Sequence, residues 1–298
     1  MNVIRLWGGL GNQLFQYALG RRIAVHTRTP VKFDAENGFR HDSFCRRFAL
    51  DVFNTEIVPA VTREIPLGMS WRSPWHRLAK LGWGVQPSAR RRVVYETEPF
   101  RFAPTVLAAR KSSAYYFGYW QNEGYFEPIR ATLQRDFTLR SGVRPPMAEL
   151  VAEMAGCRAV SMHVRRYRDL GADGRLIATA QAHHGACGAE YFQKALSLIG
   201  AEPGTVCFVF SDDLPWAKAN LKMPVPCRYV DALGPFSDAE ELLLMASCQH
   251  HVISNSSFSW WGAWLGGNPA KKVVAPRIWL RHDPELAADV CPRTWTRI

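Results

Sequence analysis

The stretch Val206-Cys207-Phe208-Val209-Phe210-Ser211-Asp212-Asp213 is an apolar run that ends in polar residues. Its length and composition are typical of a buried strand, and Cys207 inside it has the character of a small core residue. Residues 215–221 then have helical spacing. We therefore predict a buried strand followed by a helix, with two carboxylates between them.

The same pattern continues on both sides of this strand. The predicted strands are 159–164, 206–210, 228–230, 251–254 and 272–275, and the predicted helices are 147–155, 190–199, 215–221, 239–248 and 257–265. Regular alternation of this kind predicts a parallel, doubly wound sheet whose ligand lies off the carboxyl ends of the strands. Three of those ends carry the most polar motifs in the chain.

The amino terminus also begins with a strand, a turn and a helix. Residues 3–7 are apolar, Gly8-Gly9-Leu10-Gly11 follows as a turn, and residues 12–25 have helical spacing. Gly9 and Gly11 let the backbone approach a ligand, and the helix start at Asn12 favours an anion or a polar hydroxyl. The turn is a poor dinucleotide fingerprint, because Leu14 stands where the third glycine is required. A tight turn without a ligand is the alternative.

The length of the chain and the position of its prolines indicate two domains. Residues 31–34 predict a strand, 113–119 form a β-prone aromatic run, and 125–135 have helical spacing. Pro145 and Pro146 mark a linker, since proline interrupts both helix and sheet. A chain of 298 residues is therefore divided into domains 1–143 and 144–298, with a ligand cleft between them. A return of the last residues to the first domain is left open.

The charge points to an anionic partner. The formal net charge is +11, and most of the positive charge is arginine, which binds phosphate at two points. Nucleic acid, a phospholipid surface and a phosphorylated small molecule all fit this charge. A nucleic-acid-binding protein should show a charge-dense stripe and a recognised reading module. The arginines are scattered instead, so nucleic-acid binding is kept only as an alternative.

The cysteines and the hydropathy point to a reducing compartment. The seven cysteines include no CxxC pair, which argues against a disulfide framework and against a zinc site. No signal peptide and no stretch of about 20 apolar residues is present, so we predict a cytoplasmic protein. The basic surface leaves open a peripheral contact with the inner face of the membrane.

The end of the predicted strand 159–164 carries His163-Val164-Arg165-Arg166. A histidine and two arginines leaving one buried strand are expected to converge, and they suit a diphosphate that is neutralised without a metal. His163 and Arg165 share one side of the strand, because side chains alternate. A basic loop without a ligand is the alternative.

Two further strand ends carry polar groups. Asp212 or Asp213 can accept hydrogen bonds from the edge of guanine or from a ribose diol, or bind a divalent metal, or cap the following helix. A metal would need further ligands that the sequence does not offer. Ser256 and Ser257 begin a helix whose amides and hydroxyls can receive phosphate or sugar oxygens. Trp261 and Trp264 in the same helix are interpreted as core residues.

Together these motifs resemble the bacterial α-1,2-fucosyltransferases. The resemblance rests on five blocks that span nearly the whole chain: Gly8-Gly9-Leu10-Gly11-Asn12-Gln13-Leu14-Phe15-Gln16-Tyr17-Ala18, Phe117-Gly118-Tyr119-Trp120-Gln121, His163-Val164-Arg165-Arg166, Phe208-Val209-Phe210-Ser211-Asp212-Asp213 and Ile253-Ser254-Asn255-Ser256-Ser257-Phe258-Ser259-Trp260-Trp261-Gly262-Ala263. The resemblance implies a GT-B type α/β fold of two Rossmann-like domains with mostly parallel sheets. It also implies inverting transfer of fucose from GDP-fucose to the 2-hydroxyl of a galactose-terminated acceptor, with no metal.

The resemblance assigns roles to individual residues. Arg165 would hold the diphosphate, His163 would sit beside the donor, and Asp212 or Asp213 would contact the nucleoside. The other expected substrate contacts are Gly9, Gly11, Asn12, Arg166, Asn255, Ser256 and Ser257, and the expected acceptor-side residues are Asp34, Trp120 and Gln121.

One motif departs from the family. The arginine pair is usually followed by Gly-Asp-Tyr, whereas this chain has Tyr167-Arg168-Asp169. Asp169 is therefore a displaced candidate for the catalytic base, beside Asp34 and His163, and the departing phosphate could also take the proton. The altered loop keeps a further alternative open, a sugar-binding protein without turnover.

Overall fold

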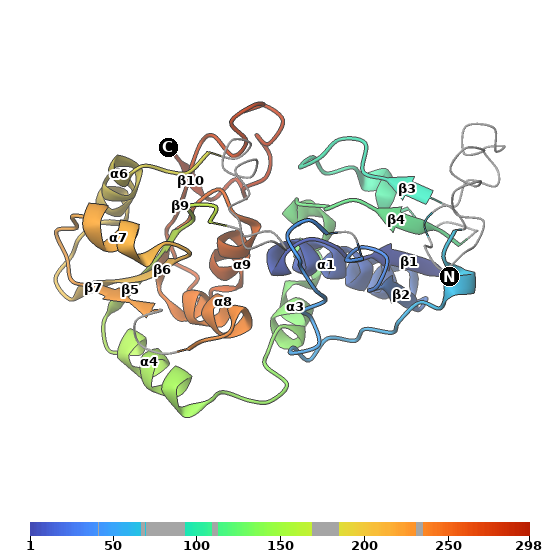
Figure 1. The fold of residues 1–298 in the computed structure, drawn as a ribbon, viewed down its shortest axis with the longest axis horizontal. Coiled ribbons are helices and arrows are strands. Elements are labelled where there is room, and N and C mark those ends of the chain that lie inside the picture. Colours follow the sequence, from blue (N-terminus) through green and yellow to red (C-terminus); the bar gives the residue numbers. More distant parts are fainter. Residues whose placement is uncertain (41, 67–68, 70–92, 109–112, 169–184, 231–234) are drawn as a thin grey trace. The chain divides into compact units, whose positions relative to one another are not determined.

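The computed structural model describes residues 1–40, 42–66, 69, 93–108, 113–168, 185–230 and 235–298 (Figure 1). The chain divides into two compact units, Met1–Phe137 and Thr138–Ile298. Each unit is built around its own sheet, and every strand pairing within the two sheets is parallel among the described residues. This architecture confirms the predicted GT-B type α/β fold class.

The first unit contains a four-stranded sheet in the order β2-β1-β4-β3. Its strands are β1 (Asn2–Arg5), β2 (Val31–Asp34), β3 (Val93–Tyr95) and β4 (Tyr115–Phe117). The predicted first helix is confirmed as α1 (Leu10–Thr27), which links β1 to β2. At Gly20 a side chain would lie 2.8 Å from the ring of Phe33, so glycine lets this helix pack closely on the sheet.

The other helical elements that the structure describes in this unit are short. They are the 3-10 helices η1 (Thr62–Glu64), η4 (Pro104–Val106), η5 (Glu123–Tyr125) and η6 (Glu127–Ile129), and the helix α3 (Arg130–Asp136). The helical spacing over 125–135 therefore does not form one helix. Pro128 explains the interruption, because it stands in the first turn of η6 and has no backbone N–H for an earlier turn.

The second unit contains a six-stranded sheet in the order β10-β9-β8-β5-β6-β7. Its strands are β5 (Arg158–Val164), β6 (Thr205–Ser211), β7 (Cys227–Tyr229), β8 (His250–Val252), β9 (Val273–Ala275) and β10 (Thr296–Arg297). Its helices are α4 (Pro145–Ala155), α6 (Ala189–Ile199), α7 (Leu214–Asn220), α8 (Asp238–Ser247) and α9 (Ser257–Leu265). The predicted strand–helix alternation is confirmed, and the last residues pair with β9 in this sheet.

The start of α4 corrects one expectation for this unit. Pro145 and Pro146 do not lie in a linker, because α4 begins at Pro145 and both prolines stand in its first turn. Proline fits there, since the first turn of a helix does not use its N–H groups and the fixed φ is already helical.

Two hydrophobic layers hold this sheet between helices. Side chains of β5 and β6 such as Met162 and Val209 pack with Phe192 of α6 and Ala217 of α7. On the other face, α8 packs against α4 and α9. Trp261 and Trp264 of α9 are fully buried, which confirms their interpretation as core residues.

The strand order places a topological switch point between β5 and β8. The chain leaves β5 for β6 on one side, and later returns to β8 on the other side of β5. In doubly wound sheets the crevice off the carboxyl ends of such strands is the usual ligand site. Because His163-Val164-Arg165-Arg166 follows β5 and Ser254-Asn255-Ser256-Ser257 follows β8, the fold brings these motifs together.

Candidate functional site

The ends of β5 and β8 are joined through one buried hydroxyl. Ser254 Oγ donates a hydrogen bond to the carbonyl oxygen of His163 at 2.7 Å and accepts one from the backbone N–H of Arg165 at 3.1 Å. Ser254 is fully buried. This bridge fixes the backbone that precedes Arg165 against the backbone that leads into α9.

Arg165 lies between β5 and β6. Its Nη1 is 3.1 Å from Asp212 Oδ2, and its guanidinium carbon is 5.3 Å from the centre of the Tyr167 ring. The side chain of Arg165 is 24% exposed, so it is held in place and still reachable from solvent. Such a guanidinium can bind a phosphate in place of a metal ion.

Asp212 organises the loop after β5. Its Oδ1 accepts a hydrogen bond from the N–H of Arg166 at 2.7 Å, and its Oδ2 accepts one from the N–H of Arg168 at 3.0 Å. The carboxylate therefore binds two backbone amides as well as the side chain of Arg165. The expected contact between this residue and the nucleoside stays a prediction, but the described contacts give Asp212 a positioning role.

Asp213 caps the next helix. Its Oδ1 accepts a hydrogen bond from the N–H of Trp216 at 3.1 Å, and this contact begins α7. Its Oδ2 lies 3.8 Å from Arg168 Nε. The helix-capping alternative for this residue is thus confirmed.

The two adjacent arginines do not converge. The guanidinium carbon of Arg166 lies 4.0 Å from the centre of the Trp216 ring, and its Nη1 donates to the carbonyl oxygen of Cys187 at 3.2 Å. Arg165 instead contacts Asp212, because successive side chains of an extended backbone point in opposite directions. The expectation that both guanidinium groups share one point is therefore wrong in this structure.

His163 is a neutral, buried imidazole beside Arg165. It is 6% exposed, and among the described residues its Nδ1 has no hydrogen-bond partner. Burial, together with the charge of Arg165, lowers the pKa of His163 to about 3. The ring is therefore uncharged at neutral pH, and its centre lies 5.7 Å from that of Phe258 in α9.

The start of α9 supplies hydroxyls and amides. Ser256 stands before the first turn, its side chain does not cap the helix, and both Ser256 and Ser257 are partly exposed. Asn255 has a structural role, because its Nδ2 donates to the carbonyl oxygens of Gly185 at 3.0 Å and Trp279 at 3.1 Å. The hydroxyl of Tyr167 donates to the carbonyl oxygen of Asn255 at 2.7 Å, which ties the arginine loop to this turn.

Asp169, the candidate base, lies outside the described residues, so its role stays a prediction. Over the described ranges of the chain, no group of three His, Cys, Asp or Glu residues is placed to hold a metal ion. The expectation of metal-independent chemistry is left for experiment.

The expected residues of the first unit lie around the β1–α1 turn. Gly9 precedes α1, Gly11 is buried inside it, and Asn12 Oδ1 accepts a hydrogen bond from Gln121 Nε2 at 2.7 Å. Trp120 is fully buried. These contacts show a packed turn, and ligand binding by these residues stays a prediction.

The carboxylate of Asp34 accepts hydrogen bonds from the turn that follows β2 and from β4. It is 2% exposed, its Oδ1 accepts hydrogen bonds from the N–H and Nδ2 of Asn37 at 3.1 and 2.8 Å, and its Oδ2 accepts one from the Tyr115 hydroxyl at 2.6 Å. The carboxylate is thus already engaged by donors of its own unit, which hold the turn after β2. We therefore do not carry Asp34 forward as a base.

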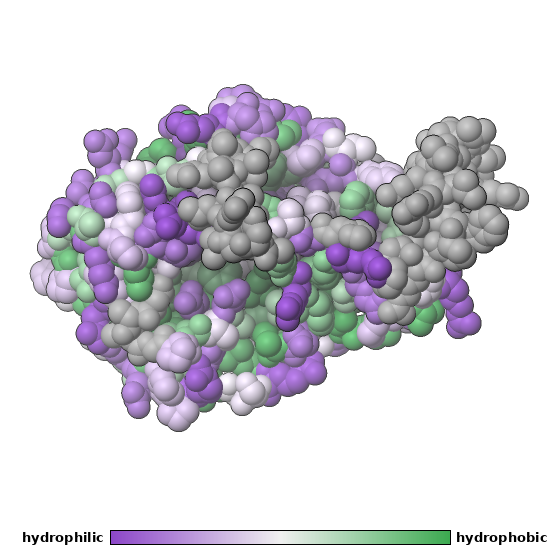
Figure 2. Space-filling model, in the orientation of Figure 1, coloured by the Kyte–Doolittle hydropathy of each residue, from purple (hydrophilic) through white to green (hydrophobic). Residues whose placement is uncertain are grey.

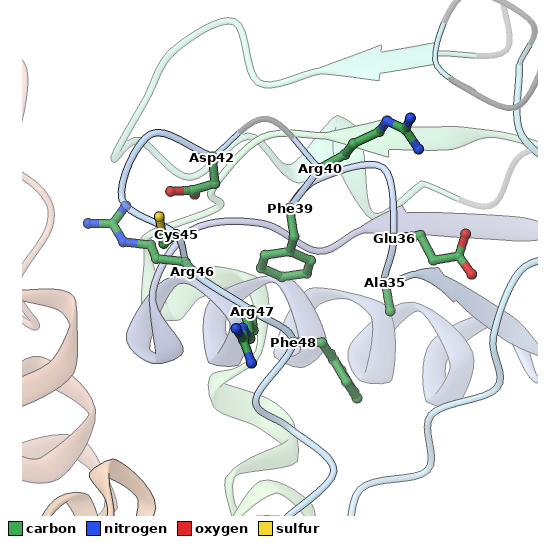
Figure 3. A pocket seen from close by; sticks show the side chains of 9 residues that line it. All are labelled: Ala35, Glu36, Phe39, Arg40, Asp42, Cys45, Arg46, Arg47 and Phe48. Carbon is green, nitrogen blue, oxygen red and sulfur yellow. The ribbon is translucent and has the colours of Figure 1, made fainter. Parts of the chain in front are cut away.

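A pocket that the sequence did not reveal lies beside this turn (Figure 3). Its volume is ≈ 540 Å³, within the usual range for a small-molecule site. The lining residues are Ala35, Glu36, Phe39, Arg40, Asp42, Cys45, Arg46, Arg47 and Phe48. The segment has no regular periodicity, so the only sequence signal was its alternation of phenylalanine with charged residues.

Comparison with known proteins identifies the family. Residues 103–296 match the description "Glycosyl transferase family 11". An Escherichia coli α-1,2-colitosyltransferase is 30% identical over 304 residues, which cover 99% of this chain and 98% of that protein. The chain belongs to glycosyl transferase family 11, and the resemblance to the α-1,2-fucosyltransferases is confirmed.

Two further similarities are more distant. A bovine (Bos taurus) galactoside 2-α-L-fucosyltransferase is 27% identical over 157 residues, which cover 50% of this chain and 41% of that protein. Fucosyltransferase NodZ from Bradyrhizobium aligns in space with 88% of this chain and 91% of its own chain, with a TM-score of 0.48 and 16% identity.

The distribution of hydrophobic residues bears on nucleic-acid and membrane binding. On the face shown in Figure 2, hydrophilic and hydrophobic residues are interspersed, and the described residues of that face form no single hydrophilic stripe. Within the described ranges, no helix combines the length and the apolar character needed to cross a bilayer.

Proposed function

We propose that this glycosyltransferase moves L-fucose from GDP-β-L-fucose to the 2-hydroxyl of a terminal galactose, with inversion and without a metal ion. The observation that carries the proposal is the position of Arg165. A reachable guanidinium pairs with Asp212 at the carboxyl end of β6, and the backbone of Arg165 is tied through Ser254 to the turn that leads into α9. This is the arrangement that a sugar nucleotide diphosphate requires.

Arg165 supplies the main catalytic charge in this proposal. When the bond between fucose and phosphate breaks, negative charge builds on the β-phosphate of the leaving GDP. A guanidinium and the amides at a helix start stabilise that charge more in the transition state than in the ground state. Ser256 and Ser257 assist from α9, while Arg166 contributes chiefly to the loop because Trp216 and Cys187 hold its side chain.

His163 serves as a neutral neighbour of the donor. Its pKa of about 3 is too low for the ring to hold a proton at neutral pH, so it is a poor general base. The acceptor proton is then left to Asp169 or to the departing phosphate. Replacement of Asp169 by asparagine separates these routes, because only the first route loses turnover.

GDP-colitose is the second candidate donor. Its support is the named activity of the Escherichia coli relative at 30% identity. Colitose is fucose without the 3-hydroxyl, so the two donors share the guanosine diphosphate and differ at one polar group. A site built to hydrogen-bond that hydroxyl would discriminate strongly between them.

The test is release of GDP from each donor with a panel of galactose-terminated acceptors, in the presence and absence of EDTA. We expect turnover with GDP-fucose that EDTA leaves unchanged, and a new α-1,2 linkage in the product. Turnover with GDP-colitose alone would show that colitose, not fucose, is the sugar transferred. Loss of turnover in EDTA would contradict the metal-free mechanism. Absence of GDP binding, measured as no rise in Tm with GDP, would refute the proposal as a whole.

A further inference from the structure

The pocket beside the β1–α1 turn is an open hollow formed by the loop that follows β2. Its lining begins at Ala35, directly after β2 ends at Asp34. Arg46 Nε lies 3.8 Å from the position that a side chain would take at Gly9, just after β1. The pocket therefore opens beside the carboxyl ends of β1 and β2, where parallel sheets bind ligands.

The loop that forms the pocket is tied to the sheet and to α1. Gln13 of α1 donates from Nε2 to the carbonyl oxygen of Arg47 at 2.8 Å and accepts at Oε1 from the N–H of Ala49 at 2.9 Å. Arg5 Nη2 donates to the carbonyl oxygen of Asn37 at 2.8 Å. At Gly38 any side chain would overlap the carbonyl oxygen of Leu6, so the loop approaches β1 closely. These contacts make the pocket a built feature of the unit.

The lining of the pocket contains more positively than negatively charged side chains. Three arginines and two carboxylates line it. In the part of the chain that the structure describes, neither Arg46 nor Arg47 forms an ion pair, and Arg46 is held by stacking on the Phe44 ring at 4.1 Å. Asp42 forms no ion pair with either of them within the described ranges, and its Oδ1 accepts a hydrogen bond from the N–H of Phe44 at 2.7 Å.

Aromatic groups adjoin these charges. Figure 3 shows the ring of Phe39 in the middle of the lining, with Arg46 and Asp42 on one side and Phe48 below. The electrostatic fields of Arg46 and Asp42 also reach Tyr119, whose pKa burial raises to about 12. Tyr119 stacks on Trp7 with ring centres 4.1 Å apart. Aromatic faces beside charged donors are well suited to a sugar that bears an acidic group.

We infer that this pocket binds an anionic group of the acceptor, either the carboxylate of an acidic sugar or the diphosphate of a sugar carrier, next to the galactose that is modified. The inference rests on the proposed function, because it gives the acceptor its binding site in the first unit. It goes further by predicting that the acceptor is charged and that Arg46 and Arg47 select it.

The experiment compares three probes for binding in the absence of donor. They are a neutral galactosyl-N-acetylglucosamine methyl glycoside, a galactosyl-glucuronic acid, and a galactosyl-N-acetylglucosamine linked to an alkyl diphosphate. The proteins are the wild type, the double variant Arg46→Gln/Arg47→Gln, and the control Arg63→Gln, an exposed arginine of η1 that does not line the pocket. Affinity is measured by titration calorimetry, and folding by Tm.

We expect at least one anionic probe to bind the wild type about tenfold to a hundredfold more tightly than the neutral probe, the range for hydrogen bonds to a charged group. The double variant should lose this preference and Arg63→Gln should keep it. The carboxylate and diphosphate arms identify the source of the charge. Equal affinity for all three probes, or a preference that survives in the double variant, would overturn the inference.

A second measurement covers the case in which the double variant does not fold. Cys45 lines the pocket and is the exposed cysteine among those described. An anionic probe should slow its reaction with a maleimide in the wild type, whereas the neutral probe at the same concentration should not. Failure of the proposed function gives a different result from failure of this inference. In that case no probe would accept fucose from GDP-fucose, although the wild type would still prefer an anionic probe.

Discussion

Replacing Asp212 by alanine should release the loop after β5 without unfolding the sheet. The carboxylate accepts hydrogen bonds from the N–H groups of Arg166 and Arg168 at 2.7 and 3.0 Å and pairs with Arg165 at 3.1 Å. A hydrogen bond to a charged group contributes about 1.5–3 kcal/mol, and a partly exposed ion pair about 0–1 kcal/mol. Because the Asp212 side chain is 18% exposed, water can replace part of this, so we expect a local loss of about 2–3 kcal/mol.

The assay is amide hydrogen exchange of residues 165–168, read together with GDP affinity. A loss of about 2 kcal/mol corresponds to exchange about thirtyfold faster. Asp212→Asn keeps one acceptor oxygen and should show roughly half the effect in free energy. Asp238→Asn is the matched control, because Asp238 is an exposed carboxylate in the first turn of α8 and belongs to neither of the loops after β5 and β6. Unchanged exchange with weakened GDP binding would refute the positioning role and support direct contact with the nucleoside.

Three further outcomes are expected. Arg165→Ala should lower kcat about a hundredfold to a thousandfold, as removal of one preorganised donor does, and near-normal kcat would contradict its assignment. Burial lowers the pKa of His251 to about 3, as it does for His163, so the unfolded chain binds protons first and stability falls as pH drops from about 6.5 toward 3. His251→Asn should therefore flatten the dependence of urea-unfolding free energy on pH by up to about 1.4 kcal/mol per pH unit in that window, and an unchanged slope would show that this ring is not responsible. Gly38→Ala should destabilise the first unit and abolish the preference for charged acceptors, whereas Gly142→Ala, where no atom lies within 4 Å but φ is +76°, should cost only the backbone strain.

The second unit was largely readable from the sequence because its strands are short apolar runs that end at polar groups. Helix α9 spans the predicted residues, and β5 and β6 differ from prediction by one residue at their ends. A strand that is buried on both faces must be apolar at nearly every position, so it is easy to recognise in a sequence. The polar residues at these strand ends also predicted the candidate site, because the carboxyl ends of parallel strands lie at the same edge of a sheet.

The partners of each polar group could not be predicted in the same way. Sequence spacing placed Arg165 and Arg166 together, yet the structure gives one to Asp212 and the other to Trp216. Which neighbour a side chain meets depends on loop geometry, and Tyr167 here adopts a left-handed conformation at φ 56°. Residues other than glycine rarely adopt the left-handed conformation, and no pattern in this sequence predicts it at Tyr167.

The pocket of the first unit escaped prediction for a related reason. Its walls are irregular backbone, with Cys45 at φ 54°, and its shape follows from hydrogen bonds between Gln13 and the loop rather than from any periodicity. Charged residues in such a segment look like a solvated surface until the backbone is seen to fold around them.

The Arg165–Asp212 pair also constrains how a donor can bind. The carboxylate of Asp212 holds the guanidinium at the carboxyl ends of β5 and β6, so the side chain is already placed before any phosphate arrives. In the proposed function, the diphosphate carries more negative charge than the carboxylate and can accept two hydrogen bonds from the same fork, so we expect it to displace Asp212 from Nη1. Asp212 does not become an unpaired charge when this happens, because the N–H groups of Arg166 and Arg168 remain bound to it. We therefore expect the loop to keep its shape while Arg165 changes partners, as the proposed metal-free mechanism needs.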